Sequence, residues 1–305
     1  MRTIVAGLGV QGHKRKHHSG ADFVASVDPI NLDADYRDIV DVPLDSYDSV
    51  LICVPDQQKE AIIHYALSKQ KNVLVEKPLF LPDIKSLMNI QDLARTNHAT
   101  FYTAYNHRFE PHIVRMNELI RSGVLGKIYS CRMFYGNGTA QIVRESIWRD
   151  YGAGVLPDLG SHLLDICNFW FDSTISGFNL SSVHRHENKA PDHVIISSEN
   201  SQPRIELEMT LCMWRNHFTC DILAENGSAH IDSLCKWGPS TFTHRVRSFP
   251  SGRPVEAKIT LVQDDPTWYA EYKYFKKLVK SNQDADLAQD IRLQTTLNSL
   301  IAIVK

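Results

Sequence analysis

The chain has 305 residues, of which 43% are hydrophobic, and its formal net charge is −2. This length suits two domains of ordinary size, and the near-neutral charge provides no general attraction to nucleic acid or to anionic membranes. No apolar stretch approaches the ~20 residues of a membrane span, and the N-terminal apolar segment is too short for a signal peptide. We therefore expect a cytoplasmic protein whose partners are small molecules.

The six cysteines lie far apart in the sequence and form no C-x-x-C pair. This pattern predicts neither a zinc site nor a disulfide framework, and we expect the thiols to be buried small apolar groups. His13 and His17 are one helical turn apart, but no acidic or cysteine partner is close in the sequence. We therefore predict no metal site.

A short apolar run at the N-terminus leads directly into Gly7-Leu8-Gly9-Val10-Gln11-Gly12. The G-x-G-x-x-G spacing after a strand predicts a dinucleotide-binding turn. Gly7 would form the tight turn, Gly9 would let the backbone approach a pyrophosphate, and Gly12 would let the helix pack on the strand. Val10 and Gln11 open this helix, whose N-terminus would face the phosphates.

A second apolar run, residues 23–27, ends in Asp28, about 20 residues after Gly7. A carboxylate there can accept hydrogen bonds from the adenosine ribose and would repel a 2′-phosphate, which favours NAD over NADP. NADP stays possible because the basic run His13 to His18 could add positive potential near the phosphates. Asp28 could instead be a turn residue before Pro29. The basic run could instead be a solvated face of the first helix.

The first third of the chain alternates between apolar strands and helices. The predicted strands are residues 50–54, 72–75 and 100–104, and the predicted helices are 59–69 and 82–97. This alternation predicts an α/β fold, a Rossmann domain over residues 1–108 with a parallel sheet covered on both faces. The acidic segment between Val27 and Val50 receives no firm assignment.

The pattern changes after Arg108. Helices are predicted at 110–121 and 159–171, strands at 128–135, 193–198, 204–211 and 217–223, and closing helices at 267–280 and 285–304. Strands joined by turns such as Asn226-Gly227 favour an open, mainly antiparallel sheet. We therefore predict a second α/β domain over residues 109–305, whose last helix can pack back on the first domain.

Polar residues follow the predicted parallel strands, where open α/β sheets bind ligands. They include Pro55, the pair Glu76-Lys77, and the segment around Asn106 and Arg108. Lys77 leaves a buried strand beside a carboxylate and is followed by proline. Taken alone, it could equally be a surface lysine at the end of a strand.

Asp158 and His162 are one helical turn apart, so both side chains can face one cavity. A histidine can take a proton from a hydroxyl group at neutral pH, and a nearby carboxylate can orient it or bind substrate. The alternative interpretation is a helix cap and a core histidine.

Together, the glycine pattern, Glu76-Lys77-Pro78, Asn106/Arg108/Phe109 and Asp158-x-x-x-His162 resemble the glucose-fructose oxidoreductase, inositol dehydrogenase and MocA-like oxidoreductase family. The resemblance runs almost end to end, through Trp148-Arg149 and Asn226-Gly227-Ser228. It implies an NAD(P)-dependent enzyme that transfers hydride between nicotinamide and a secondary hydroxyl or ketone of a sugar, cyclitol or nucleotide sugar. It also implies a homodimer or homotetramer assembled through the open sheet.

The resemblance assigns a role to each candidate site residue. Lys77 would contact the reacting hydroxyl, His162 would be the acid/base, and Asp158 would bind substrate or tune His162. Pro55 and Glu76 would border the nicotinamide and its ribose. Asn106 and Arg108 would line the substrate side.

The chain departs from the family pattern Thr-Pro-Asn-x-x-His, because it reads Val54-Pro55-Asp56-Gln57-Gln58-Lys59. The histidine position holds Lys59, so contacts on the adenine side are not carried over there. Two alternatives to the dehydrogenase remain, a catalytically silent dinucleotide-binding sensor and a reductase of a C=C or imine bond. The retained Lys77, Asp158 and His162 argue against the sensor.

Overall fold

A computed structural model describes residues 1–172, 177–198, 202–283 and 285–304, without the side chains of Ile147 and Trp148. The chain divides into two compact units. The first comprises Met1–Asn106 and Thr267–Gln294, and the second comprises His107–Pro266 and Thr295–Lys305. The predicted division into 1–108 and 109–305 assigns Thr267–Gln294 to the second domain, whereas the structure assigns this segment to the first unit.

The first unit is built on a five-stranded parallel sheet with the order β2-β1-β3-β4-β5. The strands are β1 (Thr3–Ala6), β2 (Phe23–Val27), β3 (Ser49–Ile52), β4 (Asn72–Glu76) and β5 (Phe101–Ala104). Its helices are α1 (Val10–Ser19), α2 (Asp56–Ser68), α3 (Ile84–Thr96), α8 (Thr267–Lys280) and the first turns of α9 (Ala288–Val304). The acidic segment after β2 contains the short 3₁₀ helices Ile39–Asp41 and Leu44–Ser46.

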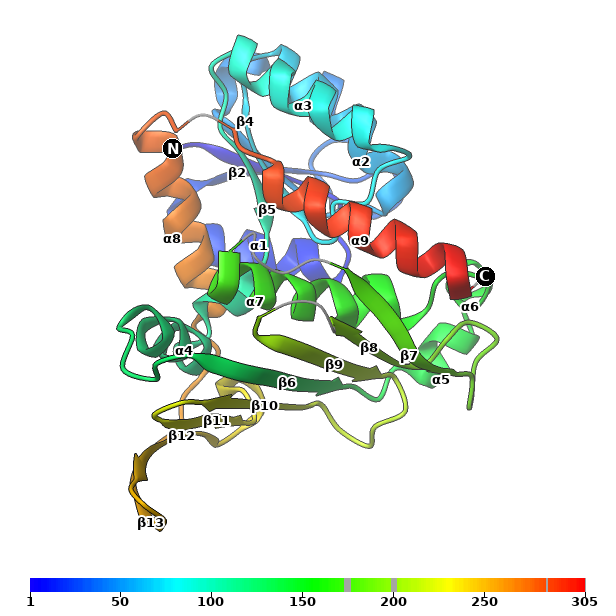
Figure 1. Ribbon diagram of the computed structural model, residues 1–305. Coiled ribbons are helices and arrows are strands. Elements are labelled where there is room, and N and C mark those ends of the chain that lie inside the picture. The colour runs from blue at the N-terminus through cyan, green and yellow to red at the C-terminus, as the bar shows by residue number, and fades with distance from the viewer. Residues whose placement is uncertain (173–176, 199–201, 284, 305) are drawn as a thin grey trace. The chain divides into compact units, whose positions relative to one another are not determined.

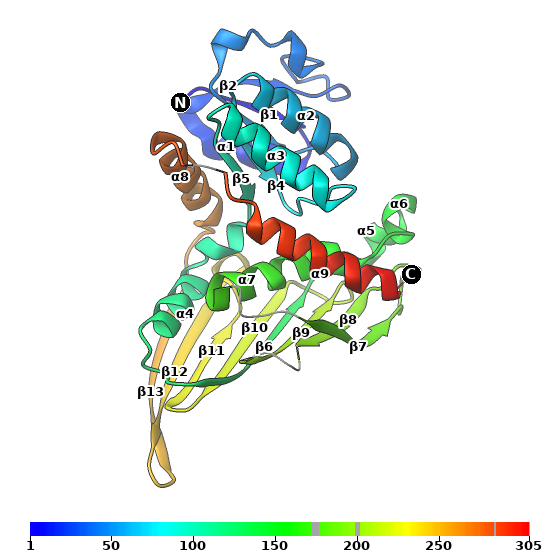
Figure 2. The ribbon, with the colours of Figure 1, turned by 45° about the horizontal axis from the view of Figure 1, so that its top comes forward.

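Both faces of this sheet are covered, as the apolar runs predict. One face packs against α2 and α3 through residues such as Ile63 and Ile90, both fully buried. The other packs against α8 through Phe275, and α1 lies beside α8. Figures 1 and 2 show α2 and α3 next to each other and α8 apart from them. The parallel, doubly covered Rossmann sheet is therefore confirmed.

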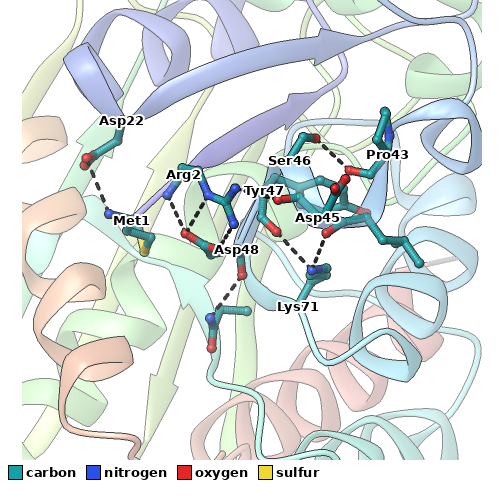
Figure 3. A network of polar contacts seen from close by, with 11 residues as sticks. Met1, Arg2, Asp22, Pro43, Asp45, Ser46, Tyr47, Asp48 and Lys71 are labelled. Atoms are coloured by element: carbon teal, nitrogen blue, oxygen red, sulfur yellow. Dashed lines mark hydrogen bonds and ion pairs between the residues drawn. The ribbon is translucent and has the colours of Figure 1, made fainter.

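Polar side chains tie together the amino-terminal ends of the strands (Figure 3). Arg2, which precedes β1, donates from its Nη2 to Oδ1 of Asp48 over 2.8 Å. Lys71, which precedes β4, donates from its Nζ to the carbonyl oxygens of Leu44 (2.7 Å) and Tyr47 (3.0 Å). These contacts occupy the edge of the sheet opposite to the glycine turn.

The second unit contains an eight-stranded sheet with the order β13-β12-β11-β10-β6-β9-β8-β7. The strands are β6 (Ile128–Gly136), β7 (Phe178–His184), β8 (His193–Ser198), β9 (Arg204–Thr210), β10 (His217–Ala224), β11 (Gly227–Asp232), β12 (Ser240–Ser248) and β13 (Gly252–Leu261). Neighbouring strands are antiparallel except β6 and β9, which are parallel. The prediction of a mainly antiparallel sheet is confirmed.

Helices α4 (Pro111–Arg121) and α7 (Ser161–Phe171) cover one face of this sheet (Figure 2), and α5 (Ala140–Arg144) and α6 (Ile147–Asp150) are short. The indole Nε1 of Trp170 in α7 donates to the carbonyl oxygen of Ile113 in α4 over 3.0 Å. Along β10, buried side chains alternate with more exposed ones, as expected for a sheet that is covered on one face. The opposite face presents Leu223 to solvent, in one cross-strand row with Ser228, Arg245 and Glu256.

All six cysteines are free thiols, and four of them are buried. Among the helices of the described ranges, none has the length and apolar character needed to cross a membrane.

The first prediction concerns the α3 face of the first unit. Leu87 is fully buried, whereas its neighbour Met88 is 52% exposed. Leu87→Ala should lower the free energy of unfolding by about 2–5 kcal/mol because it leaves a cavity. Met88→Ala should change it by less than about 0.5 kcal/mol. Urea unfolding of both variants measures the difference, and equal losses would contradict this packing.

Candidate functional site

The glycine turn between β1 and α1 has the close packing that its pattern predicts. Gly7 has φ +91°, and a Cβ there would lie 2.6 Å from the carbonyl oxygen of Cys53. A Cβ on Gly12 would lie 1.8 Å from the carbonyl oxygen of Gly7, so only glycine lets α1 approach the strand. A Cβ on Gly9 would meet nothing within 4 Å. The space beside Gly9 is therefore open to a ligand.

The N-terminus of α1 is suited to bind an anion. Gly9 is its N-cap residue and provides no side-chain hydrogen bond, and Val10 is 74% exposed. Gln11 in the same turn is also exposed. The first N–H groups of the helix and the positive end of its dipole are thus available to phosphate oxygens.

Asp28 at the end of β2 is engaged by the backbone. Its carboxylate accepts hydrogen bonds from the N–H groups of Leu8 (2.7 Å), Ile30 (2.9 Å) and Asn31 (2.8 Å). Partial burial alone would raise its pKa, but these hydrogen bonds and the charge of Arg37 hold the pKa of Asp28 below its ordinary value. Asp28 is thus an ionised turn residue, and its contact with a ribose stays a prediction.

A cavity of about 500 Å³ lies beside this turn. The ends of β1 and β2 and the segment after β3 line it, with Gly7, Val27 and Val54 among the lining residues. Arg37 lines it as well and donates from Nη1 to the carbonyl oxygen of Asn31 over 2.6 Å. The cavity lies where the adenosine half of a dinucleotide would lie in a fold of this class.

A buried ion cluster fixes Glu76 at the end of β4. Arg15 in α1 is 1% exposed, and its Nε donates to Oε1 of Glu76 over 2.6 Å. Its Nη2 donates to Oε2 of Glu271 in α8 over 2.6 Å, and the hydroxyl of Tyr102 donates to the other oxygen of Glu271. Burial, together with the charge of Glu76, raises the pKa of Glu271 to about 7, although the charge of Arg15 acts to lower it. The interpretation of the basic run as a solvated face is therefore wrong for Arg15, although His13, Lys14 and His17 are exposed.

Lys59 in α2 is buried below the segment that follows β4. Its side chain is 3% exposed, and its Nζ lies 2.7 Å from each of three oxygens. These are the carbonyl oxygens of Glu76 and Pro78 and the Oδ1 of Asp56. Burial lowers the pKa of Lys59, and the charge of Asp56 opposes this. Lys59 therefore contacts the Glu-Lys-Pro segment.

The remaining predicted residues of the first unit lie at the same edge of the sheet or close to it. Lys77 is half-buried and directly follows β4. Pro55 is the N-cap residue of α2. Asn106 is buried and donates from its Nδ2 to Oγ1 of Thr267 over 3.0 Å. In the first unit the structure thus brings Glu76, Lys77 and Pro55 to the carboxyl ends of β3 and β4.

Asp158 and His162 lie in the second unit, where the helix changes its winding. Asp158 belongs to a π-helical turn, Leu156–Gly160, and α7 begins at Ser161. The single α-helix predicted from Leu159 thus begins with a π turn, a feature often found at functional sites. Oδ2 of Asp158 lies 3.6 Å from Nη2 of Arg149, and both side chains are about one-third exposed.

The imidazole of His162 is 8% exposed and packs among aromatic rings. It stacks on His107, with 3.9 Å between the ring centroids and 16° between the planes, and Tyr135 lies 6.0 Å away. Nζ of Lys236 lies 2.6 Å from Nε2 of His107, and because an ammonium only donates, this ring nitrogen accepts. Burial, together with the charge of Asp158, raises the pKa of Tyr135.

Arg108 is held by a carboxylate of its own unit. Its Nε donates to Oδ2 of Asp165 over 2.9 Å, and its Nη2 bonds to the other oxygen of Asp165. Asp165 is 1% exposed, and burial raises its pKa against the opposing charge of Arg108. The guanidinium of Arg108 is therefore anchored to α7, and its contact with substrate stays a prediction.

Several residues that the structure places in these clusters have no site role predicted from the sequence: Arg15, Lys59, Arg149, His107, Lys236 and Glu271. Helix periodicity contained a signal for the first two. In α1 the buried positions are 12, 15 and 19, and in α2 they are 59, 63, 66 and 67, so both basic residues fall on a buried stripe. Lys236 and Glu271 are brought in from distant segments, for which local pattern contains no signal. Within the described parts of the chain, no group of three His, Cys, Asp or Glu side chains could hold a metal ion.

Comparison with known families places both units. Residues 8–105 match the model described as the oxidoreductase family with an NAD-binding Rossmann fold, and residues 113–230 match the GFO/IDH/MocA C-terminal domain. The chain belongs to the GFO/IDH/MocA family of oxidoreductases. The first unit is its NAD-binding domain.

Curated relatives match over part of their length. Glucose-6-phosphate 3-dehydrogenase of Bacillus subtilis is 27% identical over 139 residues, which cover 44% of this chain and 39% of the relative. Inositol 2-dehydrogenase of Corynebacterium glutamicum is 27% identical over 177 residues, covering 56% and 50%. The chain thus matches half of these relatives' length or less.

Solved structures match over nearly the whole chain. Levoglucosan dehydrogenase in complex with NADH has a TM-score of 0.83 at 16% identity and covers 99% of this chain and 96% of that one. UDP-N-acetylglucosamine 3-dehydrogenase from Acidithiobacillus ferrooxidans has a TM-score of 0.79 at 18% identity, covering 100% and 97%. These similarities show that the fold is shared.

The second prediction follows from the raised pKa of Glu271. Because its folded-state pKa of about 7 exceeds the ordinary 4.5, folding binds a proton between these values. Glu271→Gln keeps an oxygen that accepts from Arg15 but removes the titration. The free energy of unfolding of the wild type should therefore fall relative to that of the variant as the pH rises from about 5 to about 7.

Urea unfolding of both proteins across this pH range measures the difference. Burial lowers the pKa values of His112 and His244, but both histidines are common to the two proteins, so their titration cancels in the difference. A difference in unfolding free energy that is independent of pH would contradict the raised pKa.

Proposed function

We propose that this protein is an NAD-dependent dehydrogenase that acts on a secondary hydroxyl, or the corresponding ketone, of a sugar, cyclitol or nucleotide sugar. One observation supports it most directly. Arg15 of the glycine-turn helix is hydrogen-bonded to Glu76, the residue before Lys77, so the dinucleotide cradle and this lysine are linked within one unit. The relatives named for inositol, levoglucosan and UDP-N-acetylglucosamine support the substrate class.

The residues of the first unit fit a dinucleotide. The open space beside Gly9, the uncapped N-terminus of α1 and the cavity of about 500 Å³ provide room for its phosphates and its adenosine half. The ionised Asp28 at the end of β2 would repel a 2′-phosphate, which supports NAD over NADP. Val10, Gln11, Pro55, Glu76 and Lys77 would contact the cofactor.

A bound nicotinamide would accept or return the hydride, and the side chains of this chain would do the rest. We assign His162 as the group that takes the hydroxyl proton in the oxidative direction, with Asp158 binding substrate or orienting the imidazole. The ammonium of Lys77 would stabilise negative charge on the reacting oxygen, an effect that can contribute a few kcal/mol in a closed site. Asn106 and Arg108 would shape the substrate side.

A reductase of a C=C or imine bond would share the fold and the cofactor, so it differs in substrate alone. A sensor without catalysis would have no use for Lys77 or for the Asp158 and His162 pair. These residues therefore favour the dehydrogenase over the sensor.

The third prediction tests these roles in turnover, followed by nicotinamide absorbance across cyclitols, free sugars and nucleotide sugars. Lys77→Met and His162→Ala should each lower kcat by at least about 100-fold. Both should bind NADH within about threefold of wild type, because neither is expected to dominate cofactor affinity.

His217→Ala serves as the control, because this half-buried histidine lies on β10 and has no proposed role. It should leave kcat within about twofold. Unchanged turnover in His162→Ala would remove it as the acid/base. An inactive wild type that still binds NADH would favour the sensor.

The fourth prediction concerns assembly through the open face of the second unit's sheet. On that face the exposed apolar side chains Tyr129 and Leu223 lie beside one another and support a homodimer or homotetramer. Leu223→Glu should shift the mass measured by light scattering toward the monomer. An unchanged mass would exclude this face. The free cysteines are compatible with the reducing cytoplasm, where we propose that the protein resides.

A further inference from the structure

The backbone of the segment Glu76-Lys77-Pro78 is hydrogen-bonded to a buried cation. The ammonium of Lys59 donates to the carbonyl oxygens of Glu76 and Pro78, each over 2.7 Å. These two carbonyl groups stand on either side of Lys77. The third donor of the ammonium bonds to Oδ1 of Asp56 over 2.7 Å, so all three N–H groups have an acceptor.

The fold alone gives little reason for a lysine at this position. Residue 59 lies on the same stripe of α2 as Ile63, Ala66 and Leu67, which pack in the apolar core. Desolvating an ammonium is costly, and an apolar side chain of similar volume at such a site is often as stable or more stable. The arrangement does fix the backbone of one short segment, and that segment contains Lys77.

We propose that Lys59 is a positioning residue, which sets the direction of the Lys77 side chain by fixing the backbone on both sides of it. This inference rests on the proposed function, in which Lys77 stabilises charge on the reacting oxygen. An ammonium that is misplaced by about 1 Å loses much of that stabilisation, so a loosened segment would lower kcat more than it would weaken cofactor binding.

The chain offers a matched control in Lys71. Its Nζ also donates to two carbonyl oxygens, those of Leu44 and Tyr47 (Figure 3). Lys71 precedes β4, whereas Lys59 binds the segment after β4. The two lysines thus make the same kind of contact at opposite ends of one strand. A purely structural effect should appear in both variants, and a positioning effect should appear in one.

The fifth prediction compares Lys59→Met with Lys71→Met in the full chain. Lys59→Met should lower kcat by about tenfold or more, with the NADH dissociation constant within about threefold, measured by fluorescence titration. Lys71→Met should lower the melting temperature while kcat stays within about twofold of wild type. Lys59→His keeps a ring N–H donor, so its kcat should lie between those of Lys59→Met and wild type. This second variant also tests the proposal if Lys59→Met does not fold.

Hydrogen exchange provides a readout that does not depend on activity. The amides of Lys77, Leu79 and Phe80 should exchange several-fold faster in Lys59→Met than in wild type, and at an unchanged rate in Lys71→Met. A kcat of Lys59→Met within about twofold of wild type, while Lys77→Met is inactive, would overturn the positioning role and leave the proposed function intact. An equal loss of kcat in Lys71→Met would also overturn it. If the wild type turns over no substrate, the proposed function fails. Unchanged hydrogen exchange in Lys59→Met would separately show that Lys59 does not fix the backbone around Lys77.

Discussion

The first unit depends on one buried guanidinium. Arg15 is 1% exposed, and a guanidinium keeps its charge at any pH in which the protein folds. Such a charge is tolerated in the interior only when anions and hydrogen-bond acceptors surround it. Glu76 and Glu271 meet this need, and each comes from a different element. The helix of the glycine turn, the strand that ends before Lys77 and helix α8 must therefore assemble together.

The second unit applies the same principle to its own polar groups. Asp165 inside α7 is buried and is matched by the guanidinium of Arg108, while His162 on the same helix packs face to face with His107. Residues 107 and 108 are adjacent in the sequence, so one short segment fixes both. The segment His107-Arg108 thereby orients α7 and the imidazole of His162, which we assign as the acid/base.

Sequence reasoning predicted the features that depend on local pattern. The glycine turn has a spacing that close backbone contacts require, and the strands of the first sheet are apolar throughout because helices cover both faces. The π turn before α7 and the use of Asp28 as a turn residue have weaker local signals. Lys236 reaches His107 from 129 residues further along the chain, a contact that only the folded sheet creates.

The return of Thr267–Gln294 to the first unit bears on how the protein is made. A ribosome completes β1 to β5 long before it reaches Glu271, and during that interval Arg15 has Glu76 but not its second carboxylate. The N-terminal unit therefore cannot finish folding as it emerges, as an early domain commonly does. A fragment that ends after β5 would leave a guanidinium half-neutralised and the α8 face of the sheet bare, so a shortened version of this unit is a poor substitute for the whole chain.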